Sequence, residues 1–198
     1  ADPATVFGAI TQAWQEGTSL EQIELAMTMN CVERLLRASH GNGAKWSSLK
    51  IELMAVANIT RLKPLGETLA IKSAYPAAYL VLHNGDKGLA EVIPEANLEE
   101  NDEASTNDNL IEEIIKAIRG GDPARAIPMA NRYAHTGGDG LELLRCLFAT
   151  LGHDNTTAGQ RCMIEAWHLA KKANHPERNR ILSAMVGWEA SYRKPRDR

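Results

Sequence analysis

The sequence predicts an all-α protein, and three observations support that fold class. Apolar residues recur at helical spacing along most of the chain; Val6, Phe7, Ile10 and Trp14, for example, share one helical face. Short clusters of Gly, Pro and Asn separate these segments. Aromatic residues make up only 5% of the chain, so Ala, Leu, Ile and Met must fill most of the core. That composition suits close helix packing better than a β-sandwich, which favours Val, Tyr and Thr.

Four helices are expected in the first half of the chain. The first stops at Gly17. Thr18 and Glu21 then form a capping-box pattern that opens the second helix, because each side chain can bond the free backbone N–H of the other residue. A turn at Lys63–Gly66 separates the third helix from the fourth. The four helices are expected at residues 3–15, 19–37, 46–62 and 67–83.

An acidic segment follows the first half. Between Glu91 and Asp108 the chain holds seven carboxylates and no Lys or Arg, a composition typical of solvated chain. We interpret residues 89–108 as a linker that joins one unit at residues 1–88 to a second unit at residues 109–198. A cation site built from these carboxylates is the alternative, although the EF-hand spacing with its central Gly is missing.

Helical patterning resumes after this linker. The next helix stops at Gly120-Gly121, and Asp122 followed by Pro123 is a typical helix start, with a cap and then proline at the first helical position. Glycines and the turn Asn174-His175-Pro176 separate the later helices. The helices of this half are expected at residues 110–119, 123–135, 141–151, 157–173 and 177–192.

The two halves resemble diverged copies of one four-helix unit. A shift of 104 residues places Trp14 on Ile118 and aligns the stop and cap Gly17-Thr18 with Gly121-Asp122. We therefore expect two diverged four-helix repeat units that pack as a helical bundle or array, since stacked helical repeats bury a shared face. Chance agreement between apolar helices is the alternative interpretation.

Charge and hydropathy limit the possible partners. The formal net charge is −3, so a broad basic surface and nucleic-acid binding are not expected. No apolar run reaches the length that spans a membrane. The start, Ala1-Asp2-Pro3-Ala4, lacks the basic region and long apolar segment of a signal peptide. These features predict a protein of the aqueous phase.

The three cysteines are Cys31, Cys146 and Cys162. All lie in apolar helical stretches, and none belongs to a Cys-x-x-Cys pair. An odd, sparse set argues against a disulfide framework and for a reducing compartment. We expect buried structural thiols in a cytoplasmic protein.

Few residues suggest catalysis or metal binding. No two of the six histidines lie three or four residues apart, so no metal site on a single helix and no cofactor is predicted. A metal site assembled from several helices is the alternative. Glu165 and His168 would meet on one helical face, either as a carboxylate that orients a general base or, as we prefer, as a local surface pair. Glu52 lies among apolar residues and could point into an interior groove, although we expect it to be exposed.

Three tryptophans are candidates for a ligand pocket. Trp46, Trp167 and Trp188 lie on predicted helices and are most simply core residues. A pocket between the two repeats, lined by these side chains, is the alternative.

Four short motifs follow one another along the chain: Trp46, Ala57-Asn58, Gly121-Asp122-Pro123 and Met163-Ile164-Glu165-Ala166. Their order resembles the all-helical domain that accompanies Rieske-type ferredoxin domains in bacterial proteins. The resemblance implies histidines after the Trp and before the Met-x-Glu-Ala motif. The corresponding places here hold Lys50, Ile51 and Gly159.

The same resemblance implies a link to redox chemistry. The chain has no Cys-x-His segment that could bind a cluster, so we expect no Rieske cluster. Loss of the histidine positions also argues against an oxidoreductase activity.

Our first functional hypothesis is a non-enzymatic helical module that binds a partner protein, because helical repeats supply grooves for other segments. The second is a redox-associated enzyme with a pocket between the repeats, in which Glu52, Glu165 and His168 would act as acids and base. The third is a small-ligand carrier with an apolar cavity lined by Trp and Met.

Overall fold

The structure is a computed structural model that describes residues 2–38, 46–84, 107–151 and 158–193. Within these ranges, side chains at several helix ends are outside the description; they are those of residues 46–48, 107, 150–151, 158–159 and 192–193. The predicted linker at residues 89–108 lies outside the described residues, apart from its last two, which begin a helix.

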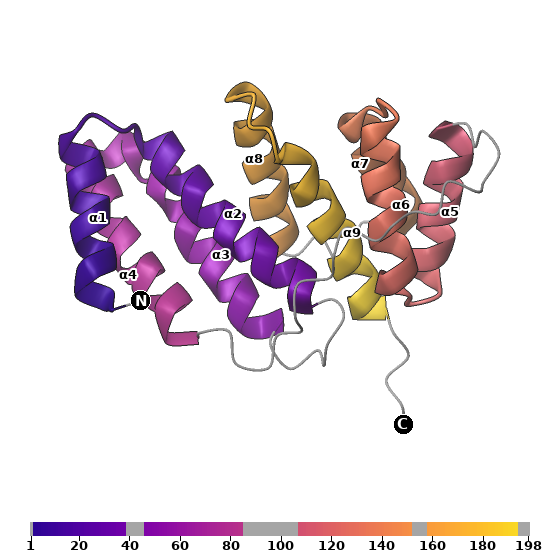
Figure 1. The fold of residues 1–198 in the computed structure, drawn as a ribbon, viewed down its shortest axis with the longest axis horizontal. Coiled ribbons are helices and arrows are strands. Elements are labelled where there is room, and N and C mark those ends of the chain that lie inside the picture. Colours follow the sequence, from indigo (N-terminus) through magenta and orange to yellow (C-terminus); the bar gives the residue numbers. More distant parts are fainter. Residues whose placement is uncertain (1, 39–45, 85–106, 152–157, 194–198) are drawn as a thin grey trace. The chain divides into compact units, whose positions relative to one another are not determined.

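The described residues form α-helices and one short 3-10 helix, with no strand among them, which confirms the predicted all-α class (Figure 1). Almost every predicted helix begins and ends within two residues of its expected position. The elements are α1 (Pro3–Gln15), α2 (Leu20–Ala38), α3 (Trp46–Arg61), η2 (Lys63–Leu65), α4 (Glu67–Asn84), α5 (Asn107–Arg119), α6 (Pro123–His135), α7 (Gly140–Leu151), α8 (Ala158–Lys172) and α9 (Arg178–Arg193).

The helices form two compact units that do not follow the order of the chain. The first unit contains α1, α2 as far as Arg34, α3, η2, α4 and α8, and the second contains α5, α6, α7 and α9. Helix α8 belongs to the second half of the sequence but packs on α3 in the first unit. The second half of the chain is therefore divided between the two units.

In the first unit, α3 packs along α4 and α8, and α4 also packs against α1. Val56 and Ile59 of α3 and Ala74 of α4 are fully buried where these helices meet their neighbours. The contact between α1 and α4 includes an edge-to-face pair of Phe7 and Tyr75, with ring centroids 5.6 Å apart. The hydroxyl groups of Tyr75 and Thr11 are 2.9 Å apart and share a hydrogen bond.

In the second unit, α6 packs along both α5 and α9. Tyr133 of α6 is fully buried and donates a hydrogen bond from its hydroxyl to the backbone oxygen of Asp139, at 3.0 Å. Gly138 lies directly against this ring, because a Cβ atom at that position would come within 2.4 Å of it. The turn between α6 and α7 therefore packs directly against the Tyr133 side chain. Burial raises the pKa of Tyr133 to about 12.

Four helices end with the same C-terminal backbone motif. After α1, α5 and α6 a glycine takes a positive φ of 90°, 68° and 82°, and after α8 Asn174 does so with a φ of 49°. At Gly17, for example, the N–H of the next residue donates back to the oxygen of Ala13. This is the Schellman arrangement, which satisfies the free carbonyls of the last helical turn.

These helix ends weaken one argument for the internal duplication. The aligned stops at Gly17 and Gly121 share their hydrogen-bond pattern, but Gly137 and Asn174 share it too and are not related to them by the shift of 104 residues. The pattern is a general means of ending a helix rather than a mark of common origin. The two-repeat architecture stays a prediction.

The capping box of α2 lies one residue later than predicted. Ser19 Oγ accepts from the N–H of Gln22 at 3.2 Å, and Gln22 Oε1 accepts from the N–H of Ser19 at 2.9 Å. The box at Thr18 and Glu21 is therefore wrong, because α2 begins at Leu20 and places Ser19 at the cap. Glu21 is left to bond Lys63 Nζ at 2.7 Å.

Replacement of the two candidate cap residues should distinguish these registers. We expect Ser19→Ala to lower the free energy of unfolding by about 1 kcal/mol, because it removes the acceptor for the Gln22 N–H. Thr18→Ala is the matched control and should change it by less than about 0.5 kcal/mol. Urea unfolding followed by circular dichroism measures both, and a larger loss for Thr18→Ala would contradict the observed register.

Candidate functional site

A buried ion pair crosses the interior of the first unit. Arg34 of α2 donates from Nη1 to Glu52 of α3, and Asn84 of α4 donates to the other carboxylate oxygen at 2.6 Å. Arg34 Nη1 also lies 3.4 Å from the backbone oxygen of Val81. Glu52 has no exposed surface and Arg34 is 5% exposed. Together with Asn84, this buried pair therefore connects α2, α3 and α4.

The expected exposure of Glu52 is wrong, and the reason is visible in these contacts. Glu52 lies on the face of α3 that carries Leu49, Leu53 and Val56, all buried. A carboxylate on such a face is tolerated only with charged and polar partners. Arg34 and Asn84 come from elements 18 and 32 residues away in the sequence, so the helix pattern of α3 alone does not reveal them.

The thiol of Cys31 lies beside this pair. It is fully buried, and burial raises its pKa to about 12, with the Glu52 carboxylate adding to the effect. A thiol with so high a pKa stays protonated and is a poor nucleophile. Cys162 is also buried and its pKa is raised by burial, whereas Cys146 is half-buried. The predicted burial is thus confirmed for two of the three cysteines.

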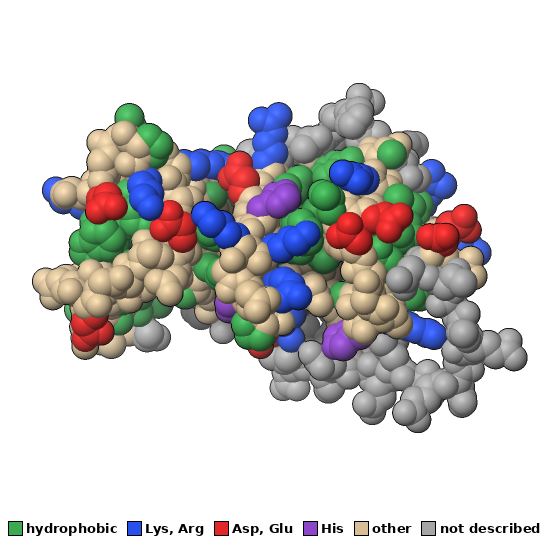
Figure 2. Space-filling view, turned by 90° about the horizontal axis from the view of Figure 1, so that it is seen from above, with side chains coloured by type: hydrophobic (Ala, Val, Ile, Leu, Met, Phe, Trp, Pro, Cys, Tyr) green, Lys and Arg blue, Asp and Glu red, His purple; other side chains and the backbone are tan. Residues whose placement is uncertain are grey.

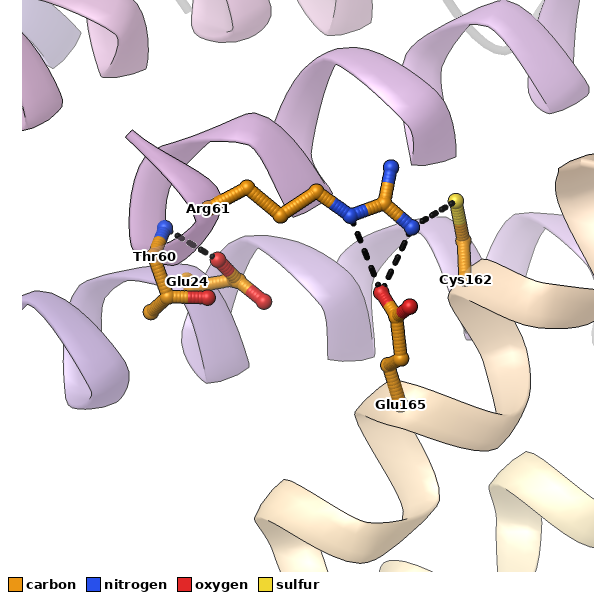
Figure 3. A network of polar contacts seen from close by, with 5 residues as sticks. All are labelled: Glu24, Thr60, Arg61, Cys162 and Glu165. Atoms are coloured by element: carbon orange, nitrogen blue, oxygen red, sulfur yellow. Dashed lines mark hydrogen bonds and ion pairs between the residues drawn. The ribbon is translucent and has the colours of Figure 1, made fainter. Parts of the chain in front are cut away.

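A second polar cluster joins α2, α3 and α8 (Figure 3). Arg61, the last residue of α3, donates from Nε and Nη2 to one oxygen of Glu165, at 3.1 and 2.6 Å. The same Nη2 lies 3.6 Å from the Sγ of Cys162, one turn earlier on α8. Arg61 and Glu165 are 40% and 52% exposed, so this ion pair lies at the edge of the unit.

Glu24 forms the inner part of that cluster. Its carboxylate accepts the backbone N–H of Thr60 at 2.8 Å and is 4% exposed. Burial raises the pKa of Glu24, while the Thr60 hydrogen bonds and the nearby Arg61 oppose the shift. Burial of a carboxyl group that has no ion pair among the described residues destabilises the folded state. The burial of Glu24 is therefore not explained by stability.

The predicted catalytic residues do not form one site. Glu165 bonds Arg61, and in the described part of the chain no hydrogen bond or ion pair joins it to His168. His168 is exposed and lies edge-on to Trp167, with ring centroids 5.2 Å apart. Glu52 is enclosed by Arg34 and Asn84. The arrangement offers no base next to a group that could be activated.

The tryptophans divide between the two units. Trp167 is buried in the first unit, with Lys171 Nζ 5.0 Å from its ring centre, and its indole N–H has no hydrogen-bond partner among the described residues. Trp188 is buried in the second unit. The side chain of Trp46 lies outside the described residues. Trp167 and Trp188 are therefore core residues, each of its own unit.

A pocket of about 270 Å³ lies in the first unit, between the start of α2 and the end of α8. Its lining has no Trp and no Met and consists of Ser19, Glu21, Gln22, Leu25, Leu169, Lys172 and Ala173. The volume is just below the usual range for small-molecule sites. Glu21 is already bonded to Lys63, so few polar groups of the pocket remain for a ligand.

The described residues contain no group of three or more His, Cys, Asp or Glu side chains placed to hold a metal ion. None of the described helices combines the length and the apolar character needed to cross a lipid bilayer.

The outer face of α4 is the most unusual surface of the first unit. The residues that α4 buries are four alanines and Ile71, whereas the large apolar side chains Leu69 and Tyr79 are 46% and 50% exposed. Leu65 of η2 is 72% exposed. We call this row the α4 stripe; it consists of the exposed residues Leu65, Leu69, Lys72, Pro76, Tyr79 and His83.

Charged side chains of both signs are spread over the visible surface. Figure 2 shows one face of the molecule, on which Lys and Arg side chains alternate with Asp and Glu among hydrophobic ones, and neither sign of charge covers the whole face. The large apolar residues classed as exposed among the described ones are the three of the α4 stripe and Ile51 of α3, which is 55% exposed.

Comparisons with known proteins leave the function open. The chain matches no protein-family model, no curated protein and no solved structure. The resemblance to the helical domain of Rieske-type proteins thus remains a prediction.

The buried ion pair leads to a prediction about stability. Glu52→Ala should lower the free energy of unfolding by about 3–5 kcal/mol, because it leaves the Arg34 guanidinium in the core without its carboxylate. The double variant Arg34→Met with Glu52→Leu should recover most of that loss, since it removes both charges together. Urea unfolding measures the three proteins, and a loss below about 1 kcal/mol for Glu52→Ala would show that the pair is solvated.

Two carboxylates of α2 should respond to pH in opposite directions. Folding raises the pKa of Glu24 above its ordinary 4.5, so its contribution to stability is complete below pH 4.5 and is lost as the pH rises through the raised pKa. Folding lowers the pKa of Glu21, chiefly through its hydrogen bond to Lys63. Its contribution is present above pH 4.5 and is lost as the pH falls through the lowered pKa.

We therefore expect Glu24→Gln to gain stability relative to the wild type as the pH rises from 4.5 toward neutrality. Glu21→Gln, three residues away, should lose relative stability as the pH rises toward 4.5 and then level off. Urea midpoints measured along a pH series test both variants. Parallel pH profiles for the two would contradict the burial of Glu24.

Proposed function

We propose that this chain is a non-catalytic interaction module that binds a partner protein through the α4 stripe. The single observation that carries this proposal is the surface pattern of α4, which buries four alanines and Ile71 and exposes Leu69 and Tyr79. An ordinary surface helix does the reverse, because burial of large apolar side chains stabilises the fold.

Two further features support this function. The small residues Ala70, Ala74, Ala77 and Ala78 complete the inner contact of α4, so the fold does not need its outer side chains. An exposed row of apolar and aromatic residues commonly marks a surface for a protein partner. Tyrosine in particular is enriched among the residues that dominate binding energy.

The catalytic alternative receives less support. Glu52 and Glu165 are bonded to arginines, and His168 stands apart from both as a possible base. Carboxylates held in this way position helices, which is a structural role. A redox-linked role remains an extension of the family resemblance and adds no residue to the proposed surface.

The proposal predicts that the α4 stripe is needed for binding and dispensable for folding. Leu69→Ser with Tyr79→Ser should change the free energy of unfolding by less than about 1 kcal/mol, since both side chains are exposed. A photo-crosslinking residue at Leu69 should capture a discrete protein in the cells of origin, and the same residue at the exposed Lys116 of α5 should not.

The captured protein must then be identified, purified and titrated against the purified chain. We expect the double variant to weaken the dissociation constant by about tenfold or more. Equal affinity of the variant and the wild type for that partner would overturn the proposal, as would identical capture at Leu69 and Lys116.

A further inference from the structure

The spacing of the α4 stripe matches the seam of a two-helix contact. Five of its residues, from Leu69 to His83, lie on α4 and are separated by alternating intervals of three and four, and Leu65 of η2 precedes them. This is the spacing at which apolar residues of one helix meet another helix in a coiled coil. At 1.5 Å per residue the five residues on α4 extend about 21 Å along the helix, or about four turns.

The charges of the α4 stripe have a single sign. Lys72 and His83 are its only ionisable side chains apart from the phenol of Tyr79. The one carboxylate of α4, Glu67, lies two residues before Leu69 and so points to another side of the helix. At the Leu65 end, Glu67 and Glu21 both act on Lys63 of η2, which balances one of their two negative charges.

A second copy of the chain fits this surface poorly. Self-association through the α4 stripe would bring the Lys72 ammonium groups of both copies into one interface to which the stripe itself contributes no carboxylate. Like charges in a helix contact oppose pairing and favour a partner of opposite sign.

We infer that the partner of the α4 stripe is an amphipathic helix with apolar residues in the same alternating spacing and with Asp or Glu flanking them. This inference rests on the proposed function and specifies its ligand. Leu65, Leu69 and Tyr79 bind the apolar row of that helix, and Lys72 and His83 bind its carboxylates.

Three synthetic helical peptides of about 20 residues test this chemistry on the whole chain. They share one Leu row at the alternating spacing and differ only in the flanking residues, which are Glu, Gln or Lys. Affinities are measured by fluorescence anisotropy at about 0.05 M and about 0.5 M salt. We expect the Glu peptide to bind about threefold to tenfold more tightly than the Gln peptide at low salt, and the Lys peptide to bind most weakly.

Variants of the chain locate the effect. Lys72→Glu should reverse the order of the Glu and Lys peptides, whereas Lys116→Glu, an equal charge change at an exposed site on α5, should leave the order unchanged. Leu69→Ser with Tyr79→Ser should remove binding of all three peptides. Sedimentation of the chain alone should show no dimer that depends on Leu69.

Several results would overturn the inference. Equal affinity for the Glu and Gln peptides, a reversed order with Lys116→Glu, binding of no peptide, or a dimer lost in Leu69→Ser would each reject an acidic helix as the partner. The proposed function is judged separately by crosslinking at Leu69, so a captured partner without an acidic helix would reject only the inference made here.

Discussion

The buried pair of Arg34 and Glu52 is the constraint on which the first unit depends. Two charges taken out of water must be matched by each other and by further polar groups, because their desolvation is costly. Asn84 donates to the second oxygen of Glu52, so α2, α3 and α4 are held at one point in one arrangement. Once this point is fixed, the alanine-rich inner face of α4 is set against its neighbours and Leu69 and Tyr79 are left outside.

The cluster around Arg61 shows how differently a charge pair acts at the surface. Arg61 and Glu165 are about half exposed, and pairs of this kind contribute only about 0–1 kcal/mol. Their contribution is mainly geometric, because they place α8 beside the end of α3. Glu24 beneath them is buried and has its pKa raised. The same cluster therefore contains an exposed ion pair with a small desolvation cost and a buried carboxyl group with a large one.

Local sequence signals predicted the helices of this protein well, since each helix carries its own apolar row and its own end signal. Small errors arose where two neighbouring residues could serve the same purpose, as with Thr18 and Ser19 at the start of α2. Larger errors arose where the deciding contact came from far along the chain. The partners of Glu52 and the packing of α8 on α3 are of this kind, and helical periodicity holds no information about them.

The α4 stripe was missed for a related reason. Leu69 and Tyr79 look like core residues in the sequence, because large apolar side chains on a helix are usually buried. Only the fold shows that four alanines and Ile71 fill the inner side of α4, whereas Leu69 and Tyr79 face outward. A helix whose bulky side chains are not needed for its own packing is free to use them elsewhere. Several charged residues of the first unit, Arg34 and Glu52 above all, hold helices together, whereas Leu69 and Tyr79 of α4 are exposed and available for binding.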